Sequence, residues 1–344
     1  MRKVFACLPA LAAVVAVLAG SPAVAQQGYK KEYNLSSIIG PPHPWGLGAE
    51  RFAELVRTRT DGRINIKIYH GASLSGGDGL KELPLTRQGV IDFAFTSSLN
   101  IASHVPQFGV FSLPFLFSQP GAIDTVISGP IGDKLFEALR SRGVEPLAWG
   151  DNGIRELTNS KHPIRSPDDM KGMKFRTVGS PIVVDVFRAL GGNPTQISWA
   201  DTQTALASGA VDGHENARSM IKMFKFWTLN QRYVSIWGAL SDVLVFWVNP
   251  AVMKNFSPED QKIVRQAAIE AGKYEVGLVR GMASVDSLRQ ELEPNGVTLT
   301  VLTNDEIAKF KVATAGVYEK WAKQVGAEFV KEVEAAVSKL DRPQ

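Results

Sequence analysis

The side chains that most often carry out chemistry are few in this sequence, and their spacing matches no catalytic pattern. The 344-residue chain has one cysteine and five histidines, and no histidine lies three to five residues from another. That spacing predicts no local metal site, although ligands far apart in the sequence can still converge in space. A Gly-x-Ser-x-Gly elbow, a Walker A loop and a His-Glu-x-x-His helix are all absent from the sequence. The sequence therefore favours ligand capture over catalysis, and we expect neither a metal nor a cofactor.

The N-terminal segment from Met1 to Ala25 has the layout of a secretory signal peptide. Arg2 and Lys3 give a positive start, residues 4–20 are apolar, and residues 23–25 form a small-x-small cleavage signature. A membrane anchor is the alternative, but a proline interrupts the apolar run, and its roughly 17 residues are marginal for spanning a bilayer. We expect cleavage near Ala25 and export to the periplasm.

Export changes what the composition means. The full chain has a formal net charge of +4 and a pI near 9.0, and loss of the leader's Arg2 and Lys3 lowers the charge to +2. The remaining sequence has no basic cluster, so a nucleic-acid partner is not expected. Cleavage also removes Cys7, the only cysteine. The mature chain, which would begin at Gln26, therefore has no thiol chemistry and no disulfide.

Alternating strand and helix patterns predict an α/β chain. Residues 64–68 alternate apolar and polar, which is typical of a strand, whereas the apolar residues at 52, 55 and 56 share one helical face. The β-α-β-α order of the first part predicts a mainly parallel sheet. The predicted strands are residues 33–39, 64–68, 91–95, 174–177 and 243–248, the last returning to the first sheet, and the predicted helices are residues 47–59, 182–190, 202–208 and 304–325.

Two lobes joined by more than one crossing account for this order. Residues 26–152 with about 241–280 form the expected first lobe, and residues 153–240 with about 281–344 form the second. A proline-free helical stretch begins with Ser257 as N-cap and runs towards Pro294. It is either one helix that braces both lobes or two helices broken near Gly277 or Gly281.

The segment from Trp149 to Asn216 holds the most distinctive blocks of sequence. In content and spacing these blocks resemble the substrate-binding proteins of tripartite ATP-independent periplasmic (TRAP) transporters, of the DctP type. Shorter matches extend the resemblance across the mature chain. The main blocks are residues 152–158 (NGIRELT), 163–176 (PIRSPDDMKGMKFR), 190–194 (LGGNP) and 205–216 (ALASGAVDGHEN), and the shorter ones are residues 52–64, 88–92 and 113–117.

The resemblance implies a two-lobe periplasmic binding protein fold, type II-like, with an interlobe cleft that closes on a small organic anion. Arg176 would bind the ligand carboxylate, because a planar guanidinium donates two parallel N–H···O bonds that lysine cannot supply. Arg155 would donate to the same or another ligand oxygen, and the Asn216 amide would fix the carboxylate's orientation.

The neighbouring acidic residues are expected to have structural roles. Glu215 and Asp212 would hold their loop through capping or hydrogen bonds rather than contact an anionic ligand. Asp168 and Asp169 would cap a turn.

Further pocket residues follow from the same resemblance. Trp199 and Trp149 stand where an aromatic side chain either stacks on the ligand or packs in the core. Two departures affect specificity, since His214 replaces a usual glutamine and Ala217 a usual proline. An aromatic-lined pocket favours an aromatic or larger apolar acid as the ligand. A C4-dicarboxylate is the alternative ligand. The first-lobe positions that face the cleft in relatives are His43, Trp45, Thr96 and Ser97.

The expected function is a monomeric periplasmic receptor. By resemblance it would deliver a carboxylate ligand to the small and large membrane subunits of a TRAP permease, with an ion gradient as the energy source. The alternatives are an ABC-type or chemoreceptor-linked binding protein, an exported enzyme such as a lyase or hydrolase, and a structural envelope protein. The missing catalytic motifs count against the enzyme.

Overall fold

The computed structural model describes residues 28–119 and 121–341. The predicted signal peptide and its cleavage site near Ala25 lie outside these residues. Within the described part of the chain, no helix is both long enough and apolar enough to cross a membrane.

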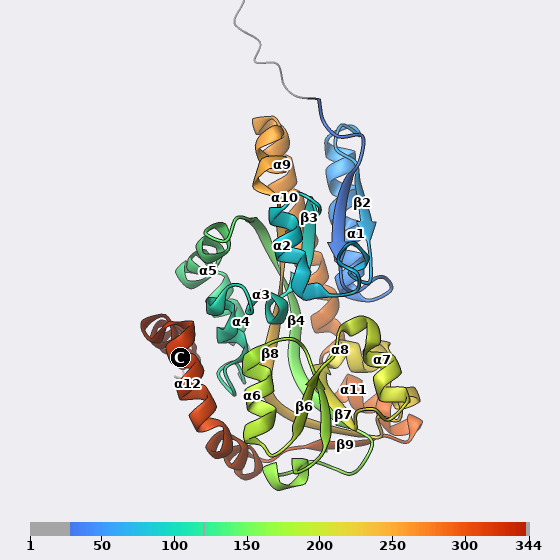
Figure 1. Ribbon diagram of the computed structural model, residues 1–344, viewed down its shortest axis with the longest axis vertical. Coiled ribbons are helices and arrows are strands. Elements are labelled where there is room, and N and C mark those ends of the chain that lie inside the picture. The colour runs from blue at the N-terminus through green and yellow to red at the C-terminus, as the bar shows by residue number, and fades with distance from the viewer. Residues whose placement is uncertain (1–27, 120, 342–344) are drawn as a thin grey trace, which may run out of the picture.

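The described residues contain nine strands, joined in one mixed sheet that extends through the upper and lower halves of the molecule (Figure 1). The strand order is β2-β1-β3-β8-β4-β7-β5-β6, and β9 pairs with β8. The strands are β1 (Tyr33–Ser37), β2 (Ile66–Tyr69), β3 (Phe93–Ser97), β4 (Glu145–Asn159), β5 (Lys174–Thr177), β6 (Asn193–Gln196), β7 (Gly213–Ala217), β8 (Tyr233–Val248) and β9 (Thr298–Val301).

The prediction of a mainly parallel sheet holds at the two ends of the sheet and is wrong in its middle. β1 pairs in parallel with β2 and β3, and β5 pairs in parallel with β6 and β7. The pairs β3–β8, β8–β4 and β4–β7 are antiparallel. The antiparallel middle follows from β4, which is not among the predicted strands, and from β8, of which only residues 243–248 were predicted.

β4 and β8 are the two long strands that cross from one lobe to the other. Their register runs from Glu145 opposite Val248 to Asn159 opposite Tyr233. The predicted returning strand at residues 243–248 is confirmed by the pairing of β8 with β3, but β8 begins at Tyr233. The β4–β8 register shifts near Gly153, whose φ of 91° lies in a region that glycine tolerates best. The lobes therefore share a continuous sheet that is irregular at the crossing.

Helices cover both halves of this sheet. The predicted helices that precede Gly209 are confirmed with small shifts of their ends. The helices are α1 (Pro44–Arg59), α2 (Glu82–Arg87), α3 (Ser98–Ile101), α4 (Ala122–Ile127), α5 (Pro130–Arg140), α6 (Pro181–Ala189), α7 (Trp199–Ala207), α8 (Arg218–Met223), α9 (Pro250–Asn255), α10 (Pro258–Met282), α11 (Val285–Leu292) and α12 (Asn304–Val337).

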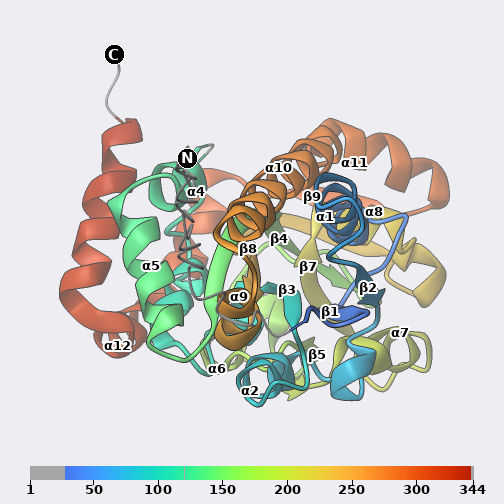
Figure 2. The ribbon, with the colours of Figure 1, turned by 90° about the horizontal axis from the view of Figure 1, so that it is seen from above.

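The long helical stretch after Ser257 is two helices. The Ser257 hydroxyl accepts the Asp260 N–H at 3.1 Å and caps α10, as predicted. α10 ends at Met282, and Ser284 then caps α11 by accepting the Ser287 N–H. The break therefore falls just after Gly281, which matches the two-helix alternative. α10 still braces the molecule, since it packs along both α1 and β4 (Figure 2).

The last helix is longer than its pattern predicted. α12 continues past Val325 to Val337, through a kink at Gly326, where φ is 120° and ψ is 104°. Its buried Phe310 and Val333 belong to the same hydrophobic cluster as Phe108. α12 thus packs on helices from two distant parts of the sequence, α4 and α6.

The contact between α10 and β4 depends on a glycine. A Cβ atom added to Gly272 would lie 2.2 Å from the carbonyl oxygen of Trp149. That distance is far inside van der Waals contact, and the neighbour is backbone that cannot rotate away. The helix can therefore approach the crossing strand this closely only without a side chain at residue 272.

Gly272→Ala is expected to lower the free energy of unfolding by about 1–3 kcal/mol through overpacking. Urea denaturation measures this loss. Gly277→Ala is the matched control, because it lies in the same helix and its added Cβ meets no atom within 4 Å. Alanine favours a helix by about 1 kcal/mol over glycine, so the control should be at least as stable as the wild type. Equal losses in both variants would contradict the close approach.

Glu82 is a buried carboxyl group that joins α2 to β1. The Ser36 hydroxyl donates to its Oε1 at 2.6 Å. Burial raises the pKa of Glu82 from 4.5 to about 7, and the Ser36 hydrogen bond opposes that rise only in part. The folded state thus binds this proton more tightly than the unfolded state. Stability should fall as the pH rises from about 4.5 to 7 and stay lower above that range.

Glu82→Gln should remove this pH dependence and keep the hydrogen bond from Ser36. We expect the variant to be more stable than the wild type by about 2–3 kcal/mol at pH 8 and little different at pH 4.5, as measured by urea denaturation at both pH values. The change Glu319→Gln, at an exposed position of α12, is the control and should have the same small effect at both pH values. A Glu82→Gln effect independent of pH would refute this account.

Candidate functional site

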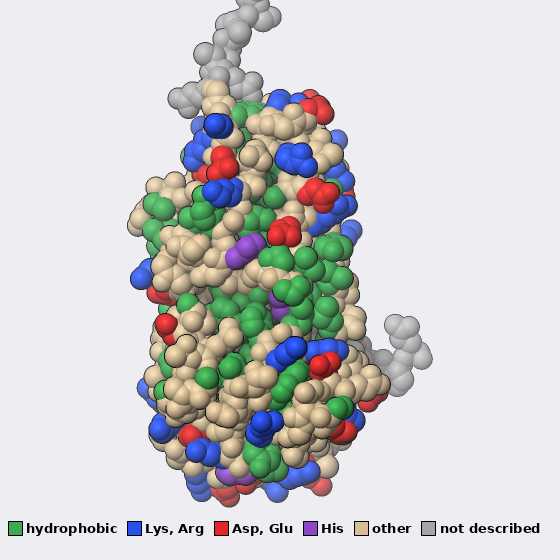
Figure 3. Space-filling model, turned by 90° about the vertical axis from the view of Figure 1, so that its right-hand side faces the viewer, with side chains coloured by type: hydrophobic (Ala, Val, Ile, Leu, Met, Phe, Trp, Pro, Cys, Tyr) green, Lys and Arg blue, Asp and Glu red, His purple; other side chains and the backbone are tan. Residues whose placement is uncertain are grey.

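A cavity of about 300 Å³ lies between the two lobes, at the crossing strands. This volume is at the lower end of the range for small-molecule sites. On the face in Figure 3, hydrophobic side chains gather in a band at mid-height, with charged side chains mainly above and below. The polar side chains that line the cavity are Asp78, Ser97, Asn100, Asn152, Arg155, Arg176, Gln196, Ser198, Asp201, Asn216 and Asp242.

Arg155 lies on β4, is almost fully buried and is already paired. Its Nε donates to Glu215 Oε2, and its Nη2 donates to Glu215 Oε1 at 3.1 Å. Its Nη1 also lies 3.5 Å from Asp242 Oδ2. Both carboxylates are themselves buried. The structure therefore brings Arg155 to the cavity wall as predicted, but with its charge compensated by the protein.

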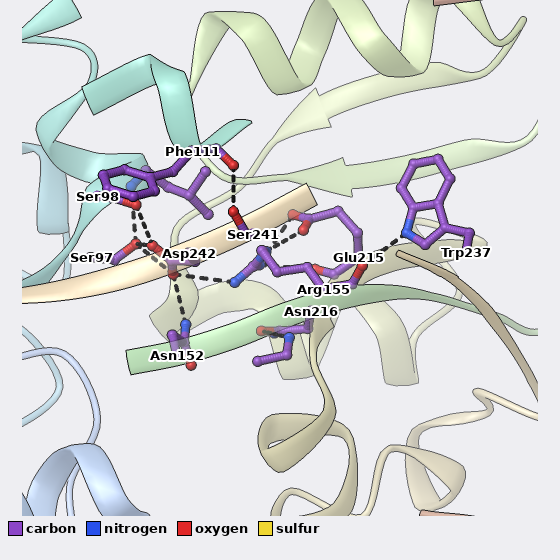
Figure 4. Close-up of polar contacts among 12 residues, drawn as sticks. Ser97, Ser98, Phe111, Asn152, Arg155, Glu215, Asn216, Trp237, Ser241 and Asp242 are labelled. Carbon is purple, nitrogen blue, oxygen red and sulfur yellow. Dashed lines mark hydrogen bonds and ion pairs between the residues drawn. The ribbon is translucent and has the colours of Figure 1, made fainter. Parts of the chain in front are cut away.

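Asp242 on β8 is the centre of a buried polar cluster (Figure 4). Its oxygens accept hydrogen bonds from the hydroxyls of Ser97 and Ser98, each at 2.7 Å, and from Asn152 Nδ2 at 2.7 Å. With Arg155, these donors come from β3, α3 and β4. Asp242 thus fixes side chains from both lobes around one carboxylate.

Arg176 on β5 has a different environment. Only 2% of the residue is exposed, and its Nε donates to the Ile197 carbonyl at 2.9 Å. Among the described residues, no carboxylate lies within ion-pair distance of its guanidinium. Burial lowers the pKa of Arg176 to about 10. The negative charge of Glu215 opposes this lowering, and the positive charge of Arg155 adds to it. Arg176 therefore stays charged at neutral pH and lines the cavity without an ion pair.

The predicted Asn216 also lines the cavity, at the end of β7. Its Oδ1 accepts the Ala217 N–H at 2.9 Å, which leaves the amide NH₂ as the group that can donate to a ligand. The adjacent His214 is fully buried against Phe226. Burial, with the charges of Arg176 and Arg155, holds the pKa of His214 well below its usual range. His214 is thus neutral and adds no charge behind the site.

Of the three tryptophans predicted to line the pocket, two line the cavity and one does not. Trp45 and Trp199 line the cavity, and the Trp199 ring also meets Phe224 edge-on at 4.9 Å. Trp149 does not line it, because its ring packs against the core, near Phe108 and Phe111, and stacks on Phe136 at 4.5 Å. The prediction of Trp149 as a pocket residue is therefore wrong, and its core alternative holds.

The remaining first-lobe predictions divide in the same way. Ser97 lines the cavity, whereas Thr96, its neighbour on β3, is fully buried and does not. Successive strand residues face opposite sides of a sheet, so a strand cannot present both. His43 is also buried away from the cavity. Its Nδ1 accepts the Trp45 N–H and so caps α1, and burial lowers its pKa to about 4. Thr96 and His43 are thus corrected to structural positions.

The structure agrees with some of the roles predicted for the acidic residues beside the motifs and differs from others. Asp169 forms a capping box with Ser166, as predicted, and Asp212 accepts the Lys174 N–H at 2.8 Å. Asp168 pairs with Lys171 at the surface instead of capping the turn. Glu215 holds no loop, because it lies within β7 and pairs with Arg155.

Sequence reasoning missed Asp242 and Asn152. Asp242 is the one charged residue in the apolar strand segment from Ala239 to Val248, and a charge at that place was a usable signal. Asn152 opens the NGIRELT block but resembles a turn residue by type. Within the described ranges, no group of three or more His, Cys, Asp or Glu side chains is arranged to hold a metal ion. The cavity is thus suited to holding a small anion through one buried arginine and several hydrogen-bonding groups.

The chain is similar to bacterial solute-binding proteins in sequence and in structure. A TRAP periplasmic solute-binding protein from Ralstonia eutropha H16, solved with bound (S)-2-acetolactate, is 48% identical with a TM-score of 0.89, over 90% of this chain and 100% of that one. A sugar acid binding protein from Advenella mimigardefordensis, in complex with galactonate, is 29% identical with a TM-score of 0.84, over 91% and 99%. A solute-binding protein from Verminephrobacter eiseniae is 30% identical over 291 residues, 85% of each chain.

The family model for bacterial extracellular solute-binding proteins of family 7, DctP, matches residues 35–324. That range includes every residue that lines the cavity. The family match confirms the resemblance that the sequence blocks carried. The similar solved structures confirm the two-lobe binding-protein fold. The chain therefore belongs to the DctP family of bacterial extracellular solute-binding proteins.

Proposed function

We propose that this protein captures a small organic acid in the periplasm and delivers it to a TRAP permease. The observation that carries the proposal is Arg176, a buried guanidinium at the cavity with no carboxylate partner among the described residues. A buried cation without a partner is costly, and a ligand carboxylate removes that cost with charge-assisted hydrogen bonds. Asn216 would donate its amide NH₂ to the same carboxylate.

The ligands of similar proteins support a carboxylate. The relatives from Ralstonia eutropha and Advenella mimigardefordensis hold (S)-2-acetolactate and galactonate. A relative from Roseobacter denitrificans binds β-D-glucuronate, and one from Sulfurospirillum deleyianum binds succinate. Each of these ligands carries at least one carboxylate. They differ in size and charge, so they support the carboxylate and leave the rest of the ligand to this chain's own cavity.

The transport cycle would use the crossing strands as a hinge. The first lobe would comprise residues 26–152 and about 241–280, and the second residues 153–240 and about 281–344. The irregular stretch of β4 at Gly153 lies at this boundary. Ligand binding to both lobes would favour the closed state and strengthen the ion pair by excluding water. The closed monomer would then dock on the small and large membrane subunits, and no step involves catalysis.

Arg176→Met is expected to weaken carboxylate binding at least about 100-fold, because it removes the guanidinium and keeps much of the side-chain volume. A thermal-shift screen of mono- and dicarboxylates finds the ligand, and calorimetry gives the affinities. The ligand-free variant should be at least as stable as the wild type, because an unpaired buried charge has been removed. Arg188→Met, at an exposed position of α6, is the control and should bind normally. Unchanged affinity in Arg176→Met would refute the proposal.

The two tryptophans give an independent test of where the ligand lies. Trp199→Leu should weaken binding at least about fivefold, since Trp199 lines the cavity. Trp149→Leu should leave affinity within about twofold but lower the free energy of unfolding by about 2–4 kcal/mol, because it opens a cavity beside Phe136. Calorimetry and urea denaturation measure the two effects, and the reverse pattern would place the ligand elsewhere.

A further inference from the structure

The charges around the cavity are unequally compensated. Among the described residues that line it, the cations are Arg155 and Arg176, and the acids are Asp78, Asp201 and Asp242. Arg155 is paired with two carboxylates, whereas Arg176 has none within ion-pair distance. No lysine or histidine is among these lining residues. One ligand carboxylate therefore has a partner in Arg176, and a second carboxylate has none.

The cavity also contains a fixed negative charge at Asp242. Its side chain is fully buried and held in place by Ser97, Ser98 and Asn152. A buried carboxylate held by so many donors cannot turn away, and little water is available to screen it. A second carboxylate on a ligand would be repelled by the negative charge of Asp242. The single contact between Asp242 and Arg155 does not cancel that charge, because Arg155 also pairs with Glu215. Burying two like charges without a cation between them is unfavourable.

The same cluster favours a hydroxyl group on the ligand. Because the Asp242 oxygens act as acceptors, Asn152 must direct its NH₂ group towards them. That orientation leaves Asn152 Oδ1 as a buried acceptor, and it has no partner among the described residues. A buried acceptor without a donor costs free energy, and a ligand hydroxyl can supply the missing hydrogen bond. A carboxylate cannot, since it has no hydrogen to donate.

We propose that this site selects monocarboxylates that carry a hydroxyl group and rejects dicarboxylates, with Asp242 as the specificity-determining residue. Arg176 binds the carboxylate, Asn152 Oδ1 accepts the hydroxyl, and Asp242 excludes a second negative charge. The remaining walls, which include Ile39, Leu99 and Met220, accept a short alkyl or acyl group. The selectivity rests on the proposed function, because it describes the acid that the same cavity captures.

Calorimetry on the exported wild-type protein tests the selectivity with matched acids. 2-Hydroxy-2-methyl-3-oxobutanoate and 2-hydroxy-2-methylmalonate differ only in a methyl group replaced by a carboxylate oxygen. 2-Hydroxybutyrate and malate differ by the replacement of a methyl group with a carboxylate. In each pair we expect the monocarboxylate to bind at least about 100-fold more tightly. Isobutyrate, which lacks the hydroxyl of 2-hydroxyisobutyrate, should bind at least about tenfold more weakly than that acid.

Asp242→Asn tests the residue itself. The change keeps the shape of the side chain and removes its charge, and Glu215 still pairs with Arg155. The ratio of monocarboxylate to dicarboxylate affinity should fall at least about tenfold. Asp168→Asn is the control, because it makes the same change at an exposed surface position outside the cavity, and it should leave the ratio within about twofold. Circular dichroism verifies folding, and the wild-type measurements stand if Asp242→Asn does not fold.

The outcomes separate the two proposals. Tight binding of the hydroxylated monocarboxylates alone, together with relaxed selectivity in Asp242→Asn, supports the inference. Dicarboxylate binding by the wild type that equals or exceeds monocarboxylate binding overturns the selectivity and leaves the organic-acid receptor intact. An unchanged affinity ratio in folded Asp242→Asn overturns the role of Asp242. If no acid of either kind binds, the proposed function fails, and the selectivity fails with it.

Discussion

The buried ion pairs of Arg155 determine the electrostatics of the whole site. Arg155 on β4 lies between Glu215 on β7 and Asp242 on β8, and all three side chains are withdrawn from water. Burying one of these charges alone would cost several kcal/mol, so each depends on the others. The cluster joins three strands at the crossing between the lobes (Figure 4). Because these carboxylates pair with Arg155, Arg176 is left as the cation available to an anion among the described residues that line the cavity.

The long strands β4 and β8 put this cluster in place. They carry Asn152, Arg155 and Asp242 on adjacent strands at the same level of the sheet, since Gly153 is paired with Asp242 and Arg155 with Leu240. α10 holds the crossing from outside through the close approach at Gly272. The strands are thus both the frame of the site and the connection between the lobes. A change in lobe orientation acts directly on the residues that line the cavity.

Local patterns predicted much of the fold. The cap at Ser257, the capping carboxylate of Asp169, and three of the helices and four of the strands that precede Gly209 follow from short-range chemistry. The motif blocks located Arg176 and Asn216. Asp242 was missed because its significance comes from its contacts with β4, a strand that lies far from it in the sequence. Trp149 and Thr96 were misplaced because a motif gives a position in the chain but not the face of the strand. That face depends on the register across the sheet.

Burial also makes the charge of the site insensitive to pH. Burial lowers the pKa of Arg176 to about 10, which still leaves it protonated throughout the range from pH 5 to 8. His43 has a pKa of about 4, and the pKa of His214 is held well below its usual range, so both stay neutral over the same range. An exported protein meets the external pH more directly than a cytosolic one, and a site built on a titrating histidine would change its affinity with that pH. In this cavity the buried arginine supplies the charge and the neighbouring histidines do not. Binding of an organic acid should then vary with pH mainly through ionisation of the acid itself, which is complete well below neutrality for an ordinary carboxylic acid.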